Sequence, residues 1–146
     1  MITFIRTGRT RSRGAEKTGR FANWWEQRLK QPTILVAEDE PIIGWDLCDT
    51  VKEAGYLVEG PFVDISSATL ACQKHKPDVA ILDVHLGDGV VYPLAEMLMS
   101  ENVPVIFHSG HHAPTEMSER YPQASALAKP CPPADVLETV QRALAE

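Results

Sequence analysis

The sequence lacks several features that would place it in a common class of protein. No run in its 146 residues approaches the roughly 18 consecutive apolar residues that a membrane-spanning helix needs. No apolar segment follows the basic N-terminus, which argues against a secretory signal peptide, and we therefore expect a cytoplasmic protein. Neither a P-loop nor the glycine fingerprint of a dinucleotide-binding turn is present.

Cysteine is also scarce. The three residues Cys48, Cys72 and Cys131 are widely spaced and form no CxxC pair. This spacing favours neither a disulfide framework nor a cysteine zinc site. We expect reduced thiols that are mostly buried.

Charge is distributed unevenly along the chain, whose net charge is −6. Residues 1–31 carry eight Lys or Arg and two acids, and the remainder carries six bases and eighteen acids. We expect a basic arm over 1–31, with a short helix at 21–30, and a single domain over 32–146. The acidic domain argues against nucleic acid as the main partner and suits a protein that binds a divalent cation.

Short apolar runs alternate with helix-like segments from residue 33 onward. Four of the runs are nearly continuous, as in strands buried on both faces, and the second is mixed, as in an edge strand. This alternation predicts an α/β fold, a doubly wound five-stranded parallel sheet with helices on both faces. The expected strands are 33–37, 56–60, 79–83, 105–109 and 125–129.

The segments between the runs have helical spacing. The first places Ile43, Leu47, Val51 and Ala54 on one face, and the last does the same with Val136, Leu137, Val140 and Leu144. Between them we expect a weak helix at 68–75, one containing Leu94 and Leu98 with Pro93 in its first turn, and a short one at 112–121.

Carboxylates follow two of the predicted strands. With the flavodoxin-like strand order 2-1-3-4-5, ligands bind where the order reverses, between the first and third strands. The first strand is followed by Glu38, Asp39 and Glu40, and the third ends at Asp83. Like charges this close are unfavourable unless a cation neutralises them, and oxygen ligands favour Mg²⁺.

The other two strand ends supply donors. Ser109 closes the fourth strand, and Lys129 closes the fifth. A carboxylate nucleophile, a cation, a hydroxyl and an ammonium around one point predict a phosphoryl-transfer site. Gly87 and Gly89 allow the loop after Asp83 to turn tightly.

These motifs resemble the receiver domain of bacterial response regulators over about residues 32–146. The acidic pair, the segment ILDVHLGDG, the segment HSG and the dipeptide KP carry the resemblance. It implies that Asp83 is the phosphoacceptor, that Ser109 and Lys129 hold phosphoryl oxygens, and that the Lys129–Pro130 bond is cis. The implied magnesium ligands are Asp39 and Asp83 directly, Glu38 mainly through water, and the backbone carbonyl of His85.

The resemblance also implies a function. A sensor histidine kinase or a histidine phosphotransfer protein would supply the phosphoryl group. The response would be a contact with a downstream protein or onward phosphotransfer. The protein would not be an enzyme beyond promoting its own phosphorylation and slow dephosphorylation. LDVHLGDG and Gly60-Pro61 look most like stand-alone receivers of alphaproteobacteria, and we expect no output domain after Glu146.

Four residues in three segments depart from the family pattern. The usual aromatic-Ala-Thr-Gly segment is Phe107-His108-Ser109-Gly110, and the usual Lys-Pro-Phe is Lys129-Pro130-Cys131. The family usually has a switching aromatic residue three positions before the lysine. Here that position is Ala126, which has no side-chain rotamer to change. We therefore expect residues 110–121 to be the segment that phosphorylation reorders.

The sequence also admits three rival interpretations. The first is a transition-metal site formed by His85, His108, His111 and His112. The alternative is that His85 contributes only its backbone and that the other three are loop residues. A constitutive binding module would have lost Asp83, Asp39 or Lys129. A hydrolase with an aspartyl-phosphate intermediate usually has a second acid two residues after the nucleophile, where this chain has His85.

Overall fold

A computed structural model describes residues 31–110 and 114–146. The expected basic arm, its short helix and the pair His111-His112 lie outside the described residues, apart from Gln31. Residues 32–146 form one compact unit. Within the described ranges, no helix is long and apolar enough to cross a membrane.

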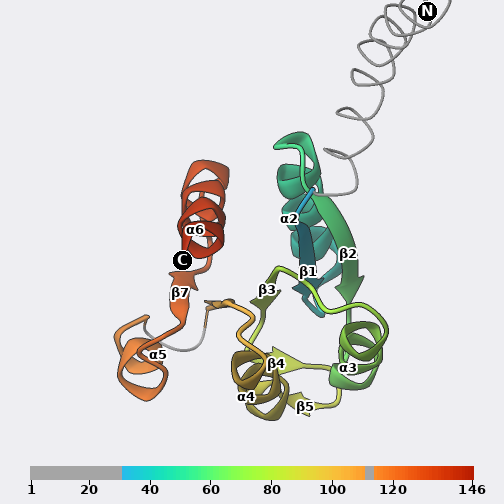
Figure 1. Ribbon diagram of the computed structural model, residues 1–146, viewed down its shortest axis with the longest axis vertical. Coiled ribbons are helices and arrows are strands. Elements are labelled where there is room, and N and C mark those ends of the chain that lie inside the picture. Colours follow the sequence, from blue (N-terminus) through green and yellow to red (C-terminus); the bar gives the residue numbers. More distant parts are fainter. Residues whose placement is uncertain (1–30, 111–113) are drawn as a thin grey trace, which may run out of the picture. The chain divides into compact units, whose positions relative to one another are not determined.

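Five parallel strands form the sheet in this part of the chain (Figure 1). Their order is β2-β1-β3-β6-β7, which is 2-1-3-4-5 when only these strands are counted. The prediction of a flavodoxin-like parallel sheet is thus confirmed. The strands are β1 (Thr33–Ala37), β2 (Leu57–Phe62), β3 (Val79–Leu82), β6 (Val105–Ser109) and β7 (Ser125–Ala128).

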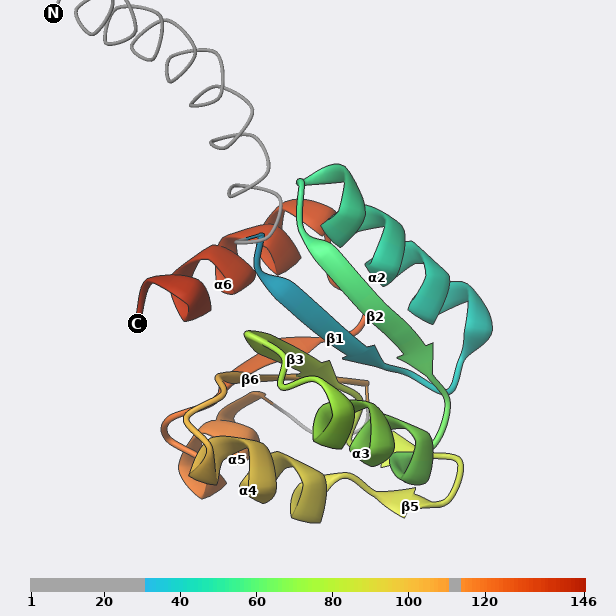
Figure 2. The same ribbon diagram turned by 45° about the vertical axis from the view of Figure 1, so that its right-hand side comes forward.

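Helices cover both faces of the sheet (Figure 2). One core lies under α3 (Ile65–Lys74), α4 (Tyr92–Ser100) and α5 (Pro114–Arg120), and the other under α2 (Pro41–Glu53) and α6 (Pro133–Ala145). Strand β1 serves both cores, because Leu35 and Ala37 face the first while Ile34 and Val36 face the second. This alternation decides which strand-end side chains face the α2–α6 side.

The buried face of α2 differs from the predicted one at its ends. Gly44, Leu47, Cys48 and Val51 are buried, whereas Ile43 is only partly buried and Ala54 is an exposed C-cap residue. The helix stops at Glu53, so Ala54 never reaches the core. A Cβ on Gly44 would lie 2.8 Å from the Cβ of Pro61, so glycine is required for α2 to approach β2 this closely.

The fifth strand of the sheet also differs from expectation. The run at 125–129 predicts a strand buried on both faces, but β7 is only partly buried from Ser125 to Leu127 and exposed at Ala128. The reason is its place in the order, since β7 pairs only with β6. The other edge strand, β2, is partly exposed as predicted.

The segment after Asp83 forms a small hairpin that the sequence did not predict. Strands β4 (His85–Leu86) and β5 (Gly89–Val90) pair in antiparallel fashion. Asp88, at the turn, accepts hydrogen bonds from the backbone N–H groups of Ile65 and Ser66 at 2.6 and 3.2 Å. These bonds fasten the hairpin to the start of α3.

The remaining helix predictions hold in outline, although Leu137 and Leu144 of α6 are only partly buried and the start of the predicted 112–121 helix lies outside the described residues. Helix α3 begins three residues earlier than expected, because Asp64 caps it by accepting from the N–H of Ser67 at 2.7 Å. Pro93 lies in the first turn of α4, and Leu94 and Leu98 are buried. The cysteines are free thiols, with Cys48 and Cys72 buried as expected.

Candidate functional site

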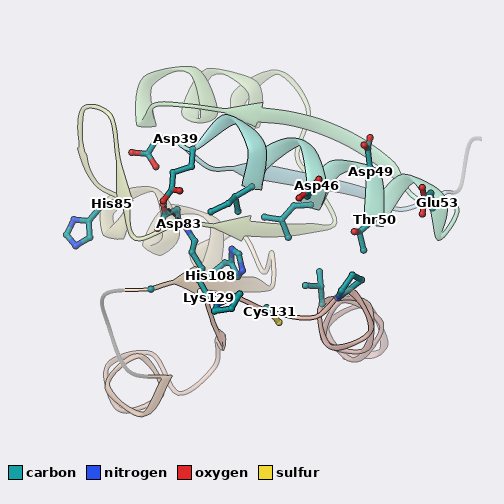
Figure 3. A pocket seen from close by; sticks show the side chains of 17 residues that line it. Asp39, Asp46, Asp49, Thr50, Glu53, Asp83, His85, His108, Lys129 and Cys131 are labelled. Atoms are coloured by element: carbon teal, nitrogen blue, oxygen red, sulfur yellow. Dashed lines mark hydrogen bonds and ion pairs between the residues drawn. The ribbon is translucent and has the colours of Figure 1, made fainter.

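The side chains predicted to carry chemistry lie at the carboxyl ends of β1, β3, β6 and β7. A cavity of about 890 Å³ opens there and extends between α2 and α6 (Figure 3). Asp39, Asp83, His108 and Lys129 line its end near the sheet. Four chain segments that are distant in sequence are therefore brought to one crevice by the parallel strands.

Three carboxylates form the centre of this crevice. Oxygen atoms of Glu38, Asp39 and Asp83 all lie within 4.8 Å of one another. Glu38 is fully buried and Asp83 is 6% exposed, while Asp39 is open to solvent. The structure thus brings together the three acidic side chains that the sequence predicts as magnesium ligands.

Lys129 is the cation of the cluster. Its Nζ lies 2.9 and 2.8 Å from the two carboxylate oxygens of Glu38 and 3.1 Å from Oδ2 of Asp83. One ammonium therefore bridges two buried carboxylates, Glu38 after β1 and Asp83 after β3. The Lys129–Pro130 peptide bond that follows is cis, as the resemblance implies.

The two buried carboxylates respond differently to this environment. Burial and the negative charge of Glu38 raise the pKa of Asp83 to about 6, against the opposing effect of Lys129. Burial also acts to raise the pKa of Glu38, but the polar contacts from His108 and Lys129 outweigh it and lower that pKa. Burial alone would lower the pKa of Lys129, yet Glu38 and Asp83 together raise it. Lys129 therefore stabilises the ionised form of Glu38 more than that of Asp83.

Ser109 and His85 flank the cluster. Ser109 is buried at the end of β6, and its carbonyl accepts a hydrogen bond from the N–H of Lys129 at 3.1 Å. His85 begins the hairpin, with an exposed imidazole that points away from the carboxylates (Figure 3). Its carbonyl, not its ring, is the group that the resemblance assigns to the metal.

His108 is a strand residue, as the run 105–109 predicts, and not the loop residue assumed in the argument against a histidine metal site. It lies within β6, only 4% exposed, and its Nδ1 is 3.9 Å from Oε2 of Glu38. Strand alternation carries the signal that should have been read, because Ile106 faces the α2–α6 core and His108 is two residues further on. Its Nδ1 has no hydrogen-bond partner in the described part of the chain.

The rival histidine metal site finds no support within the described residues. The cluster capable of holding an ion contains carboxylates alone, and neither His85 nor His108 belongs to it. His111 and His112 lie outside the described residues. An all-oxygen donor set with an exposed member suits a hard cation that keeps bound waters, such as Mg²⁺.

Comparisons with known proteins agree with this geometry. The transcriptional regulatory protein PdtaR of Mycobacterium tuberculosis is 30% identical over 116 residues, 76% of this chain and 56% of that protein. The phyllosphere-induced regulator PhyR of Methylorubrum extorquens is 32% identical over 114 residues, 76% of this chain and 43% of that protein. No protein-family model matches the chain.

Solved structures agree as well. A response regulator receiver protein from Sinorhizobium medicae superimposes with a TM-score of 0.72 at 26% identity, covering 80% of this chain and 97% of that one. The non-phosphorylated HemR receiver domain from Leptospira biflexa gives 0.70 at 25% identity, covering 80% and 96%. The chain has the fold of the response regulator receiver domains and is similar to them in sequence. It spans about half the length of the curated relatives it matches.

An aromatic side chain packs against Phe107, the strand partner of Ala126. Ala126 pairs with Phe107 in the sheet, and the ring of Tyr121 lies 5.5 Å from that of Phe107. The hydroxyl of Tyr121 donates to Oε1 of Glu96 on α4 at 3.0 Å. Tyr121, the residue after α5, therefore supplies an aromatic ring next to the strand pair that contains Ala126.

Proposed function

We propose that this receiver accepts a phosphoryl group on Asp83 from the phosphohistidine of a sensor kinase or a histidine phosphotransfer protein. The observation that carries the proposal is the environment of Asp83, a nearly buried carboxylate beside two further carboxylates and within 3.1 Å of a lysine ammonium. Such a group is held ready as a nucleophile by neighbours that can neutralise its product.

In the proposed reaction, a carboxylate oxygen of Asp83 attacks phosphorus. The bond from phosphorus to the donor breaks, and the leaving group keeps its electron pair. Lys129 already lies beside the attacked carboxylate and would contact the transferred oxygens, which carry the added negative charge. Ser109, at the end of the neighbouring strand, would donate its hydroxyl to another of them.

The carboxylates would also hold the magnesium ion on which the transfer depends. Asp39 and Asp83 would bind it directly, Glu38 mainly through water, and the His85 carbonyl would complete the protein ligands. The ion supplies positive charge that offsets repulsion between the carboxylates and the incoming phosphoryl group. Glu38, whose Oε2 lies 2.8 Å from Nζ of Lys129, would hold the ammonium beside Asp83.

The phosphorylated receiver would then signal through a changed contact with a downstream protein or by passing the group to another histidine. We propose no enzymatic activity beyond its own phosphorylation and slow dephosphorylation. The reaction is proposed for the cytoplasm, where ATP feeds the kinase.

Acetyl phosphate tests the proposal without any partner protein. The full chain should gain one phosphoryl group with Mg²⁺ and none in EDTA, as read by intact mass. Asp83→Asn should abolish the gain, whereas the matched Asp46→Asn, an exposed acid lining the same cavity, should label like the parent. An Asp83→Asn protein that labels as fast as the parent would contradict the assignment. A parent that never labels would favour the constitutive binding module.

A further inference from the structure

His108 is a buried polar side chain that the proposed reaction does not use. Its Nδ1 faces Oε2 of Glu38 at 3.9 Å and has no hydrogen-bond partner within the described residues. An N–H···O bond needs about 2.7 to 3.2 Å, so an approach of roughly 1 Å would form one. Buried polar groups are rarely left without a partner, which suggests that this pair meets in another state of the protein.

Movement of Lys129 would create a state in which His108 and Glu38 form a hydrogen bond. The Lys129 ammonium is divided between the two oxygens of Glu38 and Oδ2 of Asp83. A phosphoryl group on Asp83 would add three charged acceptor oxygens beside that ammonium and draw it toward them. Glu38 is fully buried, and its Oε2 would lose the ammonium that now lies 2.8 Å away. A buried carboxylate without a partner is strongly unfavourable.

The donors around Glu38 are not equally available. The N–H of Glu40 already donates to Oε1 at 3.2 Å and belongs to the backbone before α2. His108 instead faces Oε2, on a short path, with a nitrogen that makes no other bond in the described part of the chain. The family pattern usually has alanine at this position, so this donor is a property of the present chain.

We propose that His108 is a positioning residue that donates to Glu38 when Lys129 turns toward the phosphoryl group on Asp83. The inference rests on the proposed function of Asp83. By holding Glu38, His108 lowers the free-energy cost of moving Lys129, which favours the phosphorylated form. The neutral imidazole with hydrogen on Nδ1 is sufficient for this role. No bond is made or broken by His108.

Two substitutions in the full chain separate the donor from its shape. His108→Leu removes the N–H but fills the site, and His108→Gln keeps an N–H donor. The probes are acetyl phosphate, for the labelling rate, and beryllofluoride, for the affinity of a phosphoryl mimic measured by NMR titration. We expect His108→Leu to lower both by about tenfold, as for loss of a hydrogen bond to a charged group, and His108→Gln to restore them to within a few fold.

The affinity for Mg²⁺ alone distinguishes this role from a structural one. If His108 merely maintained the structure of the site, its replacement would also weaken Mg²⁺ binding. That affinity should be unchanged in His108→Leu, because without a phosphoryl group Lys129 stays on Glu38. His75→Leu, an exposed histidine at the end of α3, is the matched control and should behave like the parent.

Three results would overturn the inference. His108→Leu could match the parent, Leu and Gln could be equally impaired, or His108→Leu could lose Mg²⁺ binding. The first denies any role, the second assigns the role to shape, and the third places it at the metal ligands. A parent that does not label at all would instead refute the proposed function, whatever the variants do.

Discussion

Single residues at the strand ends carry unequal shares of the site's charge. Glu38 and Asp83 are buried and share Lys129, whereas Asp39 is exposed and makes no ion pair with it among the contacts in the described chain. Removal of each acid should therefore change a different property. Asp39 bears mainly on metal binding, and Asp83 on both stability and phosphorylation.

Replacing Asp39 tests the metal. Asp39→Ala should weaken Mg²⁺ binding at least about tenfold, because it removes one of three carboxylates whose oxygens lie within 4.8 Å. Calorimetric or NMR titration measures the change. Glu40→Ala, an exposed acid next to it, is the matched control, and His111→Ala and His112→Ala should also bind normally. Tight zinc binding that depends on those histidines would refute a carboxylate site.

The raised pKa of Asp83 predicts how stability depends on pH. Its pKa rises from 3.8 to about 6 on folding, so between these values the native state holds a proton that the unfolded state has lost. The free energy of unfolding should therefore fall as pH rises through this window. Asp83→Asn should flatten the fall and be more stable at pH 7.5 in EDTA, by on the order of 1–2 kcal/mol.

Urea unfolding at several pH values measures this effect, with Asp46→Asn as the control that should change little. Mg²⁺ should stabilise the parent more than Asp83→Asn, because only the parent keeps the full carboxylate cluster. An Asp83→Asn protein less stable than the parent at every pH in EDTA would show that the carboxylate is not under strain in the native state.

At the scale of elements, the contact between α4 and α5 is the candidate for transmitting the signal. Tyr121 bonds to Glu96, and the guanidinium of Arg120 lies 3.9 Å from the centre of the Tyr92 ring. These contacts border Phe107, two residues before Ser109 in β6. Movement of Ser109 toward a phosphoryl group would therefore change the packing of Phe107 against Tyr121, at the end of α5.

Hydrogen exchange with and without beryllofluoride tests this route. We expect protection to change within residues 110–121, and Tyr121→Ala to reduce the difference between the two states, because the ring links β6 to the end of α5. Leu70→Ala, an exposed residue on α3, provides the control. Changes confined to residues 33–60 would argue against the segment as the responding element.

Elements differ in how far the sequence could predict them. Strands β1, β3 and β6 were predictable because both of their faces are buried, which leaves a continuous apolar run. The exposure of β7 was not, since apolar content does not reveal an edge position. The β4–β5 hairpin has two-residue strands, too short for any periodicity. His108 lies in the predicted strand 105–109, but its place beside Glu38 was not predictable, because an apolar run does not show what a neighbouring strand end supplies.

For the whole molecule, the acidic unit 32–146 contains every strand and every candidate site residue described. Deleting residues 1–30 should leave the thermal unfolding midpoint and the labelling rate close to those of the full chain. Circular dichroism and intact mass measure the two. A truncated protein that is insoluble, or folded but unable to label, would show that Trp24 and Trp25 contribute to the domain.

The bond between Lys129 and Glu38 joins residues 91 positions apart, and α6 follows the lysine. A nascent chain on a ribosome therefore carries Glu38 and Asp83 long before Lys129, which contacts both, has been synthesised. No fragment that ends before Lys129 can assemble the crevice, and a prematurely terminated product should neither intercept phosphoryl groups nor compete for the kinase as a phosphoacceptor. The proposed phosphoacceptor site should therefore form only after Lys129 has been synthesised.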